Sequence, residues 1–359
     1  MATPREDGFR MPAEWEAHSR CWMAWPCRHS LWGDGLEAAR DAVAEVADAI
    51  AAFEPVTMLV EPDSLTDASV RCGKGVACMP MEMDDSWMRD TGPTFLLGPK
   101  GELAAVDWIF NAWGQRYRPY SRDAELAREV IEYLKIKRYQ APLVTEGGAL
   151  HVDGEGTLLA VRPSIVNDNR NPRKNQEQIE SLLLDHTGCS KLIWLPNGLH
   201  NDETDGHIDN VACFTEPGKV VTLVTDDRKD PNWEPLQENL EVLRRATDAA
   251  GRELSVATLP LPGPGTNSRG EVITLSYVNF YLANGGVILP SFDDPADDEA
   301  FETVSALFPD RRVVQVPVLD ILKGGGGIHC ITQQQPARPE AKEARPEASK
   351  DGQEDESGG

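Results

Sequence analysis

The sequence predicts an α/β protein built from repeated helix–strand units. Five segments show the apolar spacing of an amphipathic helix, and each is followed by a short β-prone segment. Hairpin-like pairs of strands fill most gaps between these units. After a long first unit the spacing is regular, which favours five related units in one domain over two domains. Such units could form a radial, propeller-like array or a doubly wound sheet, and the pattern alone leaves both open.

The predicted helices are defined by apolar residues that recur on one face. They cover residues 36–53, 123–134, 176–184, 230–251 and 297–307. Three residues mark helix ends: Asn175 as an N-cap, Pro231 at a first helical position, and Gly251 as a stop. The strand that follows each helix is expected at 56–60, 143–145, 191–195, 254–259 and 312–318.

Hairpins are predicted where two β-prone runs flank a turn sequence. The paired runs are 149–152 with 157–161, 211–214 with 219–224, and 272–282 with 286–292. Further strands are expected around 103–110 and at 328–332, where apolar and polar residues alternate. From residue 336 the chain contains no residue able to build a core, so residues 336–359 are predicted to form a disordered tail behind a single domain of residues 1–335.

Composition narrows the class of partner. The formal net charge is −24, which argues against binding nucleic acid or an anionic membrane surface and is compatible with a small cationic substrate. No run approaches the roughly 18 apolar residues that a membrane span needs, and the polar N-terminus lacks the features of a signal peptide. Seven cysteines without a Cys-x-x-Cys pair indicate neither a disulfide framework nor a zinc ribbon, and a cytoplasmic location is the simplest interpretation.

Residues suited to catalysis follow four of the five helix–strand units, in polar or glycine-rich stretches. These residues are Asp90, Glu146, His207 with Asp209, and Cys330. If the units are equivalent, the four stretches meet at one end of the array. One cysteine, one histidine and three carboxylates would then lie together, with Cys330 as candidate nucleophile.

Each candidate also has a structural interpretation. Cys330 could be a small buried hydrophobe after a tight turn, and Asp90 could fix the turn before a Gly-Pro pair. The acidic run at 201–209 lacks the spacing of a calcium-binding helix–loop–helix, and the glycines at 324–327 lack the Gly-Lys-Ser/Thr of a phosphate loop. Trp87 is expected either in the core or stacked on a planar cation.

Several motifs together resemble agmatine deiminases, and they cover nearly everything except the tail. In chain order they are Met11-Pro12-Ala13-Glu14-Trp15-Glu16, Trp87-Met88-Arg89-Asp90-Thr91-Gly92-Pro93, Glu146-Gly147-Gly148, Asp202-Glu203-Thr204-Asp205-Gly206-His207-Ile208-Asp209-Asn210, residues 279–286 and residues 324–335. One departure is Gly327, where many members of that family carry an asparagine. The family belongs to the guanidine-modifying enzymes with the pentein fold, so the resemblance implies a five-bladed α/β propeller of ββαβ-type units.

The resemblance implies hydrolysis of agmatine to N-carbamoylputrescine and ammonia, in putrescine biosynthesis. Asp90 and Asp209 would bind the guanidinium in bidentate fashion. Cys330 would attack its central carbon, and His207 would act as general acid and then general base. Glu146 would orient His207. No metal and no organic cofactor is required.

Trp87 and Gly327 complete the expected substrate site, beside Asp90 and Asp209. Alternatives stay open: a peptidyl-arginine or other guanidine deiminase of the same fold, a cysteine amidase or peptidase, and a non-catalytic binding module. Arginine residues at 116, 118 and 269 lie in candidate rim loops, so the pattern alone does not exclude a grip on a substrate carboxylate. The oligomeric state is undefined, and a homo-oligomer is compatible with the sequence.

Overall fold

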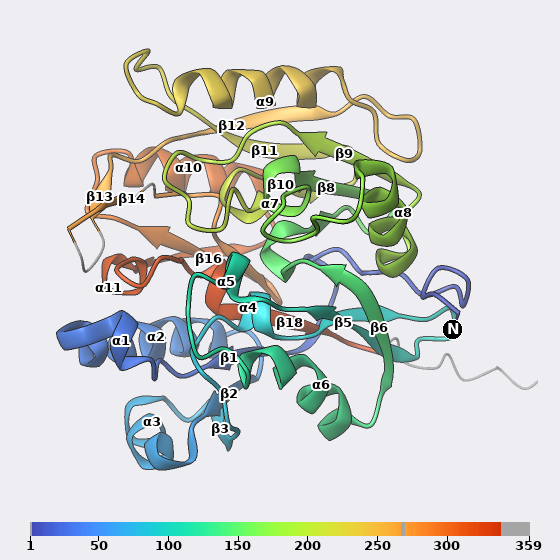
Figure 1. Cartoon of the computed structure of the whole chain (residues 1–359). Helices are drawn as coiled ribbons and strands as arrows, with labels where there is room; N and C mark the ends of the chain where they lie inside the picture. Colours follow the sequence, from blue (N-terminus) through green and yellow to red (C-terminus); the bar gives the residue numbers. More distant parts are fainter. Residues whose placement is uncertain (1, 267–269, 274, 339–359) are drawn as a thin grey trace, which may run out of the picture.

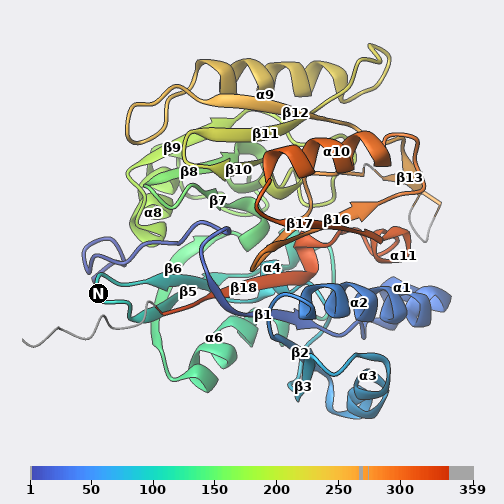
Figure 2. The same cartoon turned by 180° about the vertical axis from the view of Figure 1, so that it is seen from behind.

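The computed structural model describes residues 2–266, 270–273 and 275–338, and it shows a mixed α/β fold (Figures 1 and 2). Four sheets share one topology, in which a hairpin is followed by a helix and by a strand parallel to the second hairpin strand. Their elements are β4 (Thr94–Leu97), β5 (Leu103–Ile109), α6 (Asp123–Leu134) and β6 (Lys137–Val144); β7 (His151–Val152), β8 (Thr157–Val161), α8 (Gln176–Thr187) and β9 (Lys191–Leu195); β10 (Ala212–Glu216), β11 (Lys219–Val224), α9 (Trp233–Arg245) and β12 (Ser255–Pro260); and β15 (Tyr281–Ala283), β16 (Gly286–Ser291), α10 (Asp297–Leu307) and β17 (Arg312–Pro317).

The fifth sheet joins the two ends of the chain. β18 pairs antiparallel with β1, and β2 and β3 extend the sheet in parallel. In this register Met23 lies opposite Thr332, and the Trp22 indole donates to Gln335 Oε1 at 2.9 Å. The elements of this unit are β18 (Thr332–Pro336), β1 (His18–Ala24), α2 (Leu36–Ala51), β2 (Val56–Val60), α3 (Leu65–Arg71) and β3 (Val76–Pro80).

Short elements link these sheets. They are α1 (His29–Trp32), η1 (Gly33–Gly35), η2 (Pro62–Ser64), α4 (Met88–Thr91), α5 (Ala112–Gln115), η3 (Gly147–Ala149), α7 (Arg162–Ile165), η4 (Ile208–Asn210), the ribbon of β13 (Gly265–Thr266) and β14 (Val272–Ile273), α11 (Leu319–Leu322) and η5 (His329–Ile331).

Four of the long helices pack between neighbouring sheets, whereas α6 contacts β5 and β6 of its own sheet. α8 contacts β6 and β9, α9 contacts β9 and β12, α10 contacts β12 and β17, and α2 contacts β17 and β2. In Figure 1, α9 lies along β12 on the outside of the molecule. The strands beneath are strongly apolar: every residue of β2, β4 and β8 is buried. The core therefore fills the spaces between sheets and their helices.

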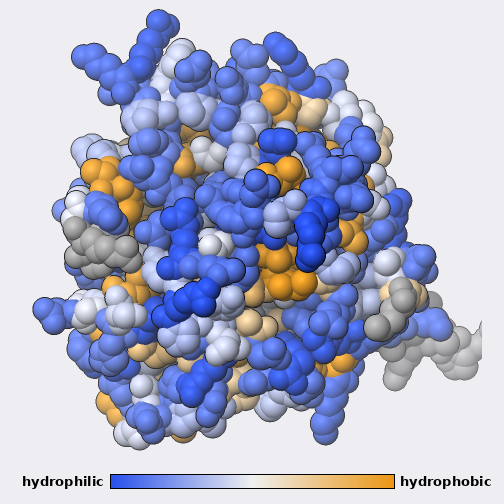
Figure 3. Space-filling model, in the orientation of Figure 1, coloured by the Kyte–Doolittle hydropathy of each residue, from blue (hydrophilic) through white to orange (hydrophobic). Residues whose placement is uncertain are grey.

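The face in Figure 3 is predominantly hydrophilic, with apolar residues scattered between charged ones. In the part of the chain that the structure describes, no helix is both long and apolar enough to cross a membrane.

The structure confirms the five predicted helix–strand units and contradicts the doubly wound alternative, because the strands form separate sheets. The capping box at Asn175 is present: its side chain accepts from Gln178 N at 2.9 Å. Two helices are shorter than predicted: α2 ends at Ala51, and α9 begins at Trp233 and ends at Arg245, so Pro231 lies before the helix and not at its first position. The chain then turns, with Gly251 N donating to Asp248 O, so Gly251 is a turn residue rather than a helix stop.

Three strand predictions need correction. The strand predicted at 272–282 is interrupted by a turn in which Ser276 Oγ accepts from Val278 N, and β15 begins only at Tyr281. The strand predicted at 328–332 begins at Thr332, because His329–Ile331 form a 3₁₀ turn that leads into it. The strand predicted at 143–145 is longer and starts at Lys137, while α3 and β3 were not predicted. Residue 274 of the predicted strand lies outside the described residues.

The predicted tail mostly falls outside the described residues, at 339–359. Its first residue, Pro336, is the last residue of β18 and lies opposite His18.

Candidate active site

The predicted catalytic residues lie on short turns that precede the first strand of four sheets. α4 precedes β4, η3 precedes β7, η4 precedes β10 and η5 precedes β18. These turns contact one another through α4, which touches η3 and η5, and through η3, which touches η4. The equivalent position of the turns in each unit brings together residues that are far apart in the sequence.

Gly148 marks the point of convergence. A Cβ atom added there would lie 2.6 Å from His207 Nδ1, 2.9 Å from Asp209 Oδ2 and 2.9 Å from Asp90 Oδ1. Only glycine fits between three polar side chains that approach so closely. The structure therefore brings the predicted histidine and two of the predicted carboxylates to one point.

The two aspartates are held by different partners. Asp90 accepts from Gly148 N through Oδ1 and from the Trp113 indole through Oδ2, both at 2.9 Å. Asp209 Oδ2 accepts from His329 Nδ1 at 2.9 Å, while its buried Oδ1 has no partner among the described residues. A buried carboxylate oxygen without a donor is costly unless a ligand supplies one. The free Oδ1 therefore indicates a cationic or hydrogen-bond-donating ligand.

His207 lies between Asp90 and Glu146. Its Nε2 is 3.3 Å from Glu146 Oε2, and its Nδ1 is 3.8 Å from Asp90 Oδ2. Glu146 is fixed from behind by Arg170, whose Nε is 2.8 Å from Oε1. Burial opposes a charge on His207, but Asp90 and Glu146 outweigh it and raise its pKa to about 9. His207 is therefore protonated at neutral pH, and Nδ1 is not hydrogen-bonded to Asp90 at this distance.

Cys330 lies on η5 and is buried, with its Sγ 3.9 Å from Asp209 Oδ2. Burial, and then the charges of Asp209 and Asp90, raise the pKa of the thiol well above its usual range. Burial also raises the pKa of Asp90 to about 6, with Asp209 and Glu146 adding to the effect and His207 opposing it. The site therefore stabilises positive charge and disfavours a thiolate until a cation is bound.

A second histidine is held on the other side of Asp209. His329 Nε2 is 2.9 Å from Glu14 Oε2, while Glu14 Oε1 accepts from Leu282 N at 2.8 Å. Burial and Arg89 oppose a charge on His329, but Glu14 and Asp209 outweigh them and raise its pKa. Burial would raise the pKa of Glu14, but His329 holds it well below its usual range. Asp209 is thus bound to a histidine that Glu14 fixes from the other side.

Cys330 faces a pocket of about 350 Å³, here called the nucleophile pocket. Its walls are Trp87, Asp90, Trp113, Tyr117, Glu203, Thr204, Gly324, Gly325, Gly326 and Cys330. Trp87 stacks on Trp32 with ring centroids 5.7 Å apart, and its indole donates to Asp85 Oδ2 at 3.0 Å. The predicted substrate-binding Trp87 is therefore a rigid wall of this pocket.

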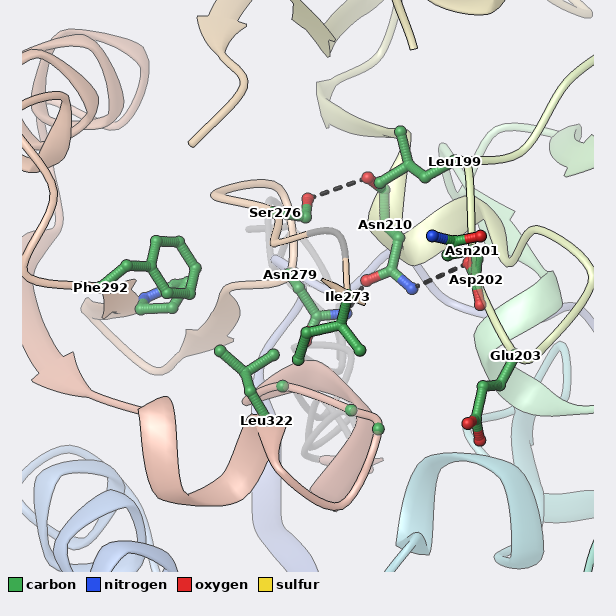
Figure 4. A pocket seen from close by; sticks show the side chains of 14 residues that line it. Leu199, Asn201, Asp202, Glu203, Asn210, Ile273, Ser276, Asn279, Phe292 and Leu322 are labelled. Atoms are coloured by element: carbon green, nitrogen blue, oxygen red, sulfur yellow. Dashed lines mark hydrogen bonds between the residues drawn. The ribbon is translucent and has the colours of Figure 1, made fainter. Parts of the chain in front are cut away.

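A second pocket, the adjoining pocket, also borders the glycine run and has a volume of about 540 Å³ (Figure 4). It shares Glu203, Gly325 and Gly326 with the nucleophile pocket, and its walls include Asn279 and Gly327. Gly327, predicted to bind substrate, therefore lines this pocket and not the one that Cys330 faces.

Several site residues were missed by sequence reasoning. Trp113 holds Asp90 from a backbone with φ 53° and ψ 47°, a left-handed conformation that a tryptophan rarely adopts. The Tyr117 hydroxyl donates to Glu203, and Arg170 orients Glu146. No spacing marked Trp113, Tyr117 or Arg170. Glu203 and Glu14 stood within quoted motifs, but nothing in the sequence indicated their role.

Comparison with known proteins identifies the family of this chain. A family model described as Porphyromonas-type peptidyl-arginine deiminase matches residues 10–336. Agmatine deiminase of Pseudomonas aeruginosa strain LESB58 is 48% identical, in an alignment that covers 94% of this chain and 98% of that protein. The chain belongs to the agmatine deiminase family.

Solved structures of the agmatine deiminase family are similar throughout. The agmatine deiminase of Enterococcus faecalis matches with a TM-score of 0.91 at 36% identity, covering 94% of this chain and 99% of that one. A cysteine-to-serine variant of the agmatine deiminase of C. jejuni, with substrate bound, matches with a TM-score of 0.84 at 25% identity, covering 92% and 97%. The resemblance inferred from the motifs is therefore confirmed, and the family is one of hydrolases.

Proposed function

We propose that this protein hydrolyses agmatine to N-carbamoylputrescine and ammonia through a covalent intermediate on Cys330. One observation carries the proposal: two buried aspartates and an imidazolium converge at Gly148, and Asp209 keeps a buried oxygen without a donor among the described residues. A planar guanidinium supplies the missing N–H donors to both carboxylates, and its single positive charge offsets part of their negative charge. In this proposal Asp90 and Asp209 fix the plane of the guanidinium in front of Cys330.

The first half of the reaction forms the adduct. The bound guanidinium places a positive charge against the sulfur, which lowers the pKa of the Cys330 thiol, so that the thiol loses its proton to solvent water and becomes a thiolate. The thiolate attacks the central carbon, so that a C–S bond forms. His207, protonated at neutral pH, donates a proton from Nδ1 to the departing nitrogen, and the C–N bond breaks with release of ammonia.

The second half hydrolyses the adduct. Neutral His207 takes a proton from water, whose oxygen attacks the same carbon. The C–S bond then breaks as the new hydroxyl group loses its proton to solvent water and becomes the carbonyl of N-carbamoylputrescine. The product leaves, and the sulfur returns as a thiolate. Glu146, held by Arg170, stabilises the imidazolium in both halves and keeps Nδ1 directed at the substrate. All of these steps use side chains of this chain.

The choice of agmatine over arginine is supported by the charge of the pocket wall. Among the described residues that line the nucleophile pocket, none is an arginine or a lysine, whereas Glu203 is present beside Tyr117. Agmatine presents an ammonium at its far end, which Glu203 would bind. Arginine adds a carboxylate there, and burial of that group without a cation is costly. Arg116 is 3.3 Å from Asp205, and Arg269 lies outside the described residues.

We also propose the arrangement that this site implies for the whole chain. The five units have like topology, and α8, α9, α10 and α2 each contact two successive sheets. β18 pairs with β1, so the end of the chain joins the sheet formed by its beginning. These features support a five-bladed propeller. Residues 1–335 would then be one catalytic domain. All seven cysteines, which lie among the described residues, are free thiols, and this supports a cytoplasmic location. No role in binding nucleic acid or a membrane is proposed.

Peptidyl-arginine deiminase is the second candidate, favoured by the description of the matching family model. The test is ammonia release with agmatine, free arginine and an arginine peptide at equal concentration. We expect kcat/KM for agmatine to exceed the other two by about 10²- to 10⁴-fold. Citrulline production equal to N-carbamoylputrescine production would contradict the choice of substrate, and equal activity on the peptide would favour the second candidate.

A further inference from the structure

The fifth unit also places a polar side chain at the site. Asn279 lies just before β15, at the position that α4, η3, η4 and η5 occupy in the other units. Its side chain is buried and sits beside Asn210 in the wall of the adjoining pocket (Figure 4). The reaction described above gives this residue no role.

The Asn279 amide contacts the sulfur directly. Nδ2 lies within hydrogen-bond distance of three acceptors that share its two hydrogens: Cys330 Sγ at 3.4 Å, Asn210 Oδ1 at 3.0 Å and the Asp209 carbonyl at 3.3 Å. Oδ1 accepts from His329 N at 3.0 Å and lies 3.7 Å from Cys330 Sγ. A backbone carbonyl on one side and a backbone N–H on the other leave the amide only one orientation. The donor of Asn279 is therefore fixed towards the sulfur.

Gly327 makes this orientation possible. A Cβ atom at Gly327 would lie 2.4 Å from Asn279 Oδ1, so any side chain there would displace the amide. Hydrogen bonding by the Gly327 backbone also lowers the pKa of the Cys330 thiol, against the larger effect of burial. The absence of a side chain at 327, where the sequence departs from many family members, thus leaves space for Asn279 beside the nucleophile.

We propose that Asn279 is a catalytic residue that stabilises the Cys330 thiolate by donating a hydrogen bond from Nδ2. In the thiol form, the S–H can point to Oδ1 or to Asp209, so one amide serves both protonation states. The inference deepens the proposed function, because it assigns the donor that the covalent step requires. The charged groups around the sulfur make such a donor necessary.

Those groups are predominantly acidic. Asp90 from α4 and Asp209 from η4 raise the pKa of the thiol, and Glu203 lines the same pocket. His207 and Glu146 pair behind Asp90, and His329 and Glu14 pair behind Asp209. A neutral donor stabilises the thiolate without repelling the cationic substrate, which a lysine or arginine in this place would do.

The test is alkylation of Cys330 by iodoacetamide across a pH series, without substrate, followed by mass spectrometry of the Cys330 peptide. Asn279→Asp keeps the shape and the acceptor for His329 N but replaces the donor by a second acceptor. We expect the alkylation pKa of Cys330 to rise by about one unit or more. For agmatine, kcat/KM at pH 7 should fall by about 10- to 10²-fold. Asn279→Ala should shift the alkylation pKa in the same direction by less.

Asn201→Asp is the matched control. It adds the same charge to the wall of the adjoining pocket, at an exposed residue that does not contact the sulfur. Asn201 has a left-handed backbone conformation, which an aspartate also tolerates. It should leave the alkylation pKa within about 0.3 units of the wild type. If Asn279→Asp does not fold, as judged by thermal unfolding, the Ala variant decides.

An unchanged alkylation pKa in the folded Asn279 variants would overturn the inference, even if activity falls, because a structural role would lower rates without moving that pKa. Because alkylation needs no agmatine, this outcome is independent of the choice of substrate. A protein that is inactive on agmatine but shows the pKa shift would contradict the proposed function and not the role of Asn279.

Discussion

The site contains two buried histidines, His329 and His207, and each lies between two carboxylates. They differ in the distances from their ring nitrogens to those carboxylates. His329 is 2.9 Å from both Glu14 and Asp209, so that both ring nitrogens are hydrogen-bonded. His207 is 3.3 Å from Glu146, but 3.8 Å from Asp90. The first histidine is held on both sides, and the second has one nitrogen at hydrogen-bond distance from protein and one facing the site.

In the proposed reaction, this difference separates a histidine that holds Asp209 from a histidine that carries a proton. A histidine that gives its proton away must have a nitrogen free to reach the reacting group, and Nδ1 of His207 meets that need at the convergence point beside Gly148. His329 has both nitrogens engaged, so it can only hold Asp209 in place. The two histidines share residue type and burial, so the distance from each ring nitrogen to its carboxylate is what distinguishes their proposed roles.

The largest expected effect is the difference in kcat between variants of the two histidines. His207→Ala removes the acid and base, and kcat should fall by about 10²- to 10⁴-fold. His329→Gln keeps one donor to Asp209, so it should change kcat by less than about tenfold and act mainly on KM. Single-turnover kinetics with agmatine measure both halves of the reaction. A larger loss of kcat in the His329 variant would reverse the assignment.

The rear carboxylates offer a matched pair of isosteric variants. Glu146→Gln removes the charge that stabilises His207 as an imidazolium, so kcat should fall by about 10- to 10²-fold. Glu14→Gln weakens the clamp on Asp209, so KM for agmatine should rise by about three- to tenfold while kcat is nearly kept. Steady-state kinetics of the two variants side by side give the answer. Equal effects on kcat would show that the Glu146–His207 pair and the Glu14–His329 pair have equivalent roles.

The pH profile sharpens the comparison through a smaller effect. In the wild type, kcat/KM should fall below about pH 6, where Asp90 becomes protonated and loses its charge. It should also fall above about pH 9, where His207 loses the proton that ammonia needs. Glu146→Gln should move the alkaline limb to lower pH, because a charge that raises the His207 pKa is gone, and Glu14→Gln should leave that limb in place. An alkaline limb that moves with Glu14 would assign it to His329.

The sequence was sufficient to predict the residues whose position is set by the repeat. Cys330, His207, Glu146 and both aspartates follow helix–strand units, and the turns before β4, β7, β10 and β18 bring them together. The fifth turn, with Asn279, was not predicted as part of the site, because an amide in an aromatic segment carries no chemical signal. The pattern also predicted a strand across that turn.

The partners of these residues could not be predicted, because they depend on contacts across the molecule. Glu14 and His329 are 315 positions apart, and Arg170 reaches Glu146 from an irregular segment between α7 and α8. Trp113 depends on a left-handed backbone that no propensity favours. Local patterns describe elements, whereas charge pairing in a buried site depends on the packing of whole units.

The central claim, an adduct of the substrate carbon on Cys330, is tested most directly by mass spectrometry of enzyme quenched during turnover with agmatine. The amidino adduct is expected on the peptide that contains Cys330, and it should be absent from Cys330→Ser, which should fold but not turn over. In His207→Ala, mixing with agmatine should form the adduct slowly, and it should then persist. An adduct on Cys78 or Cys213, or full turnover by Cys330→Ser, would contradict the account.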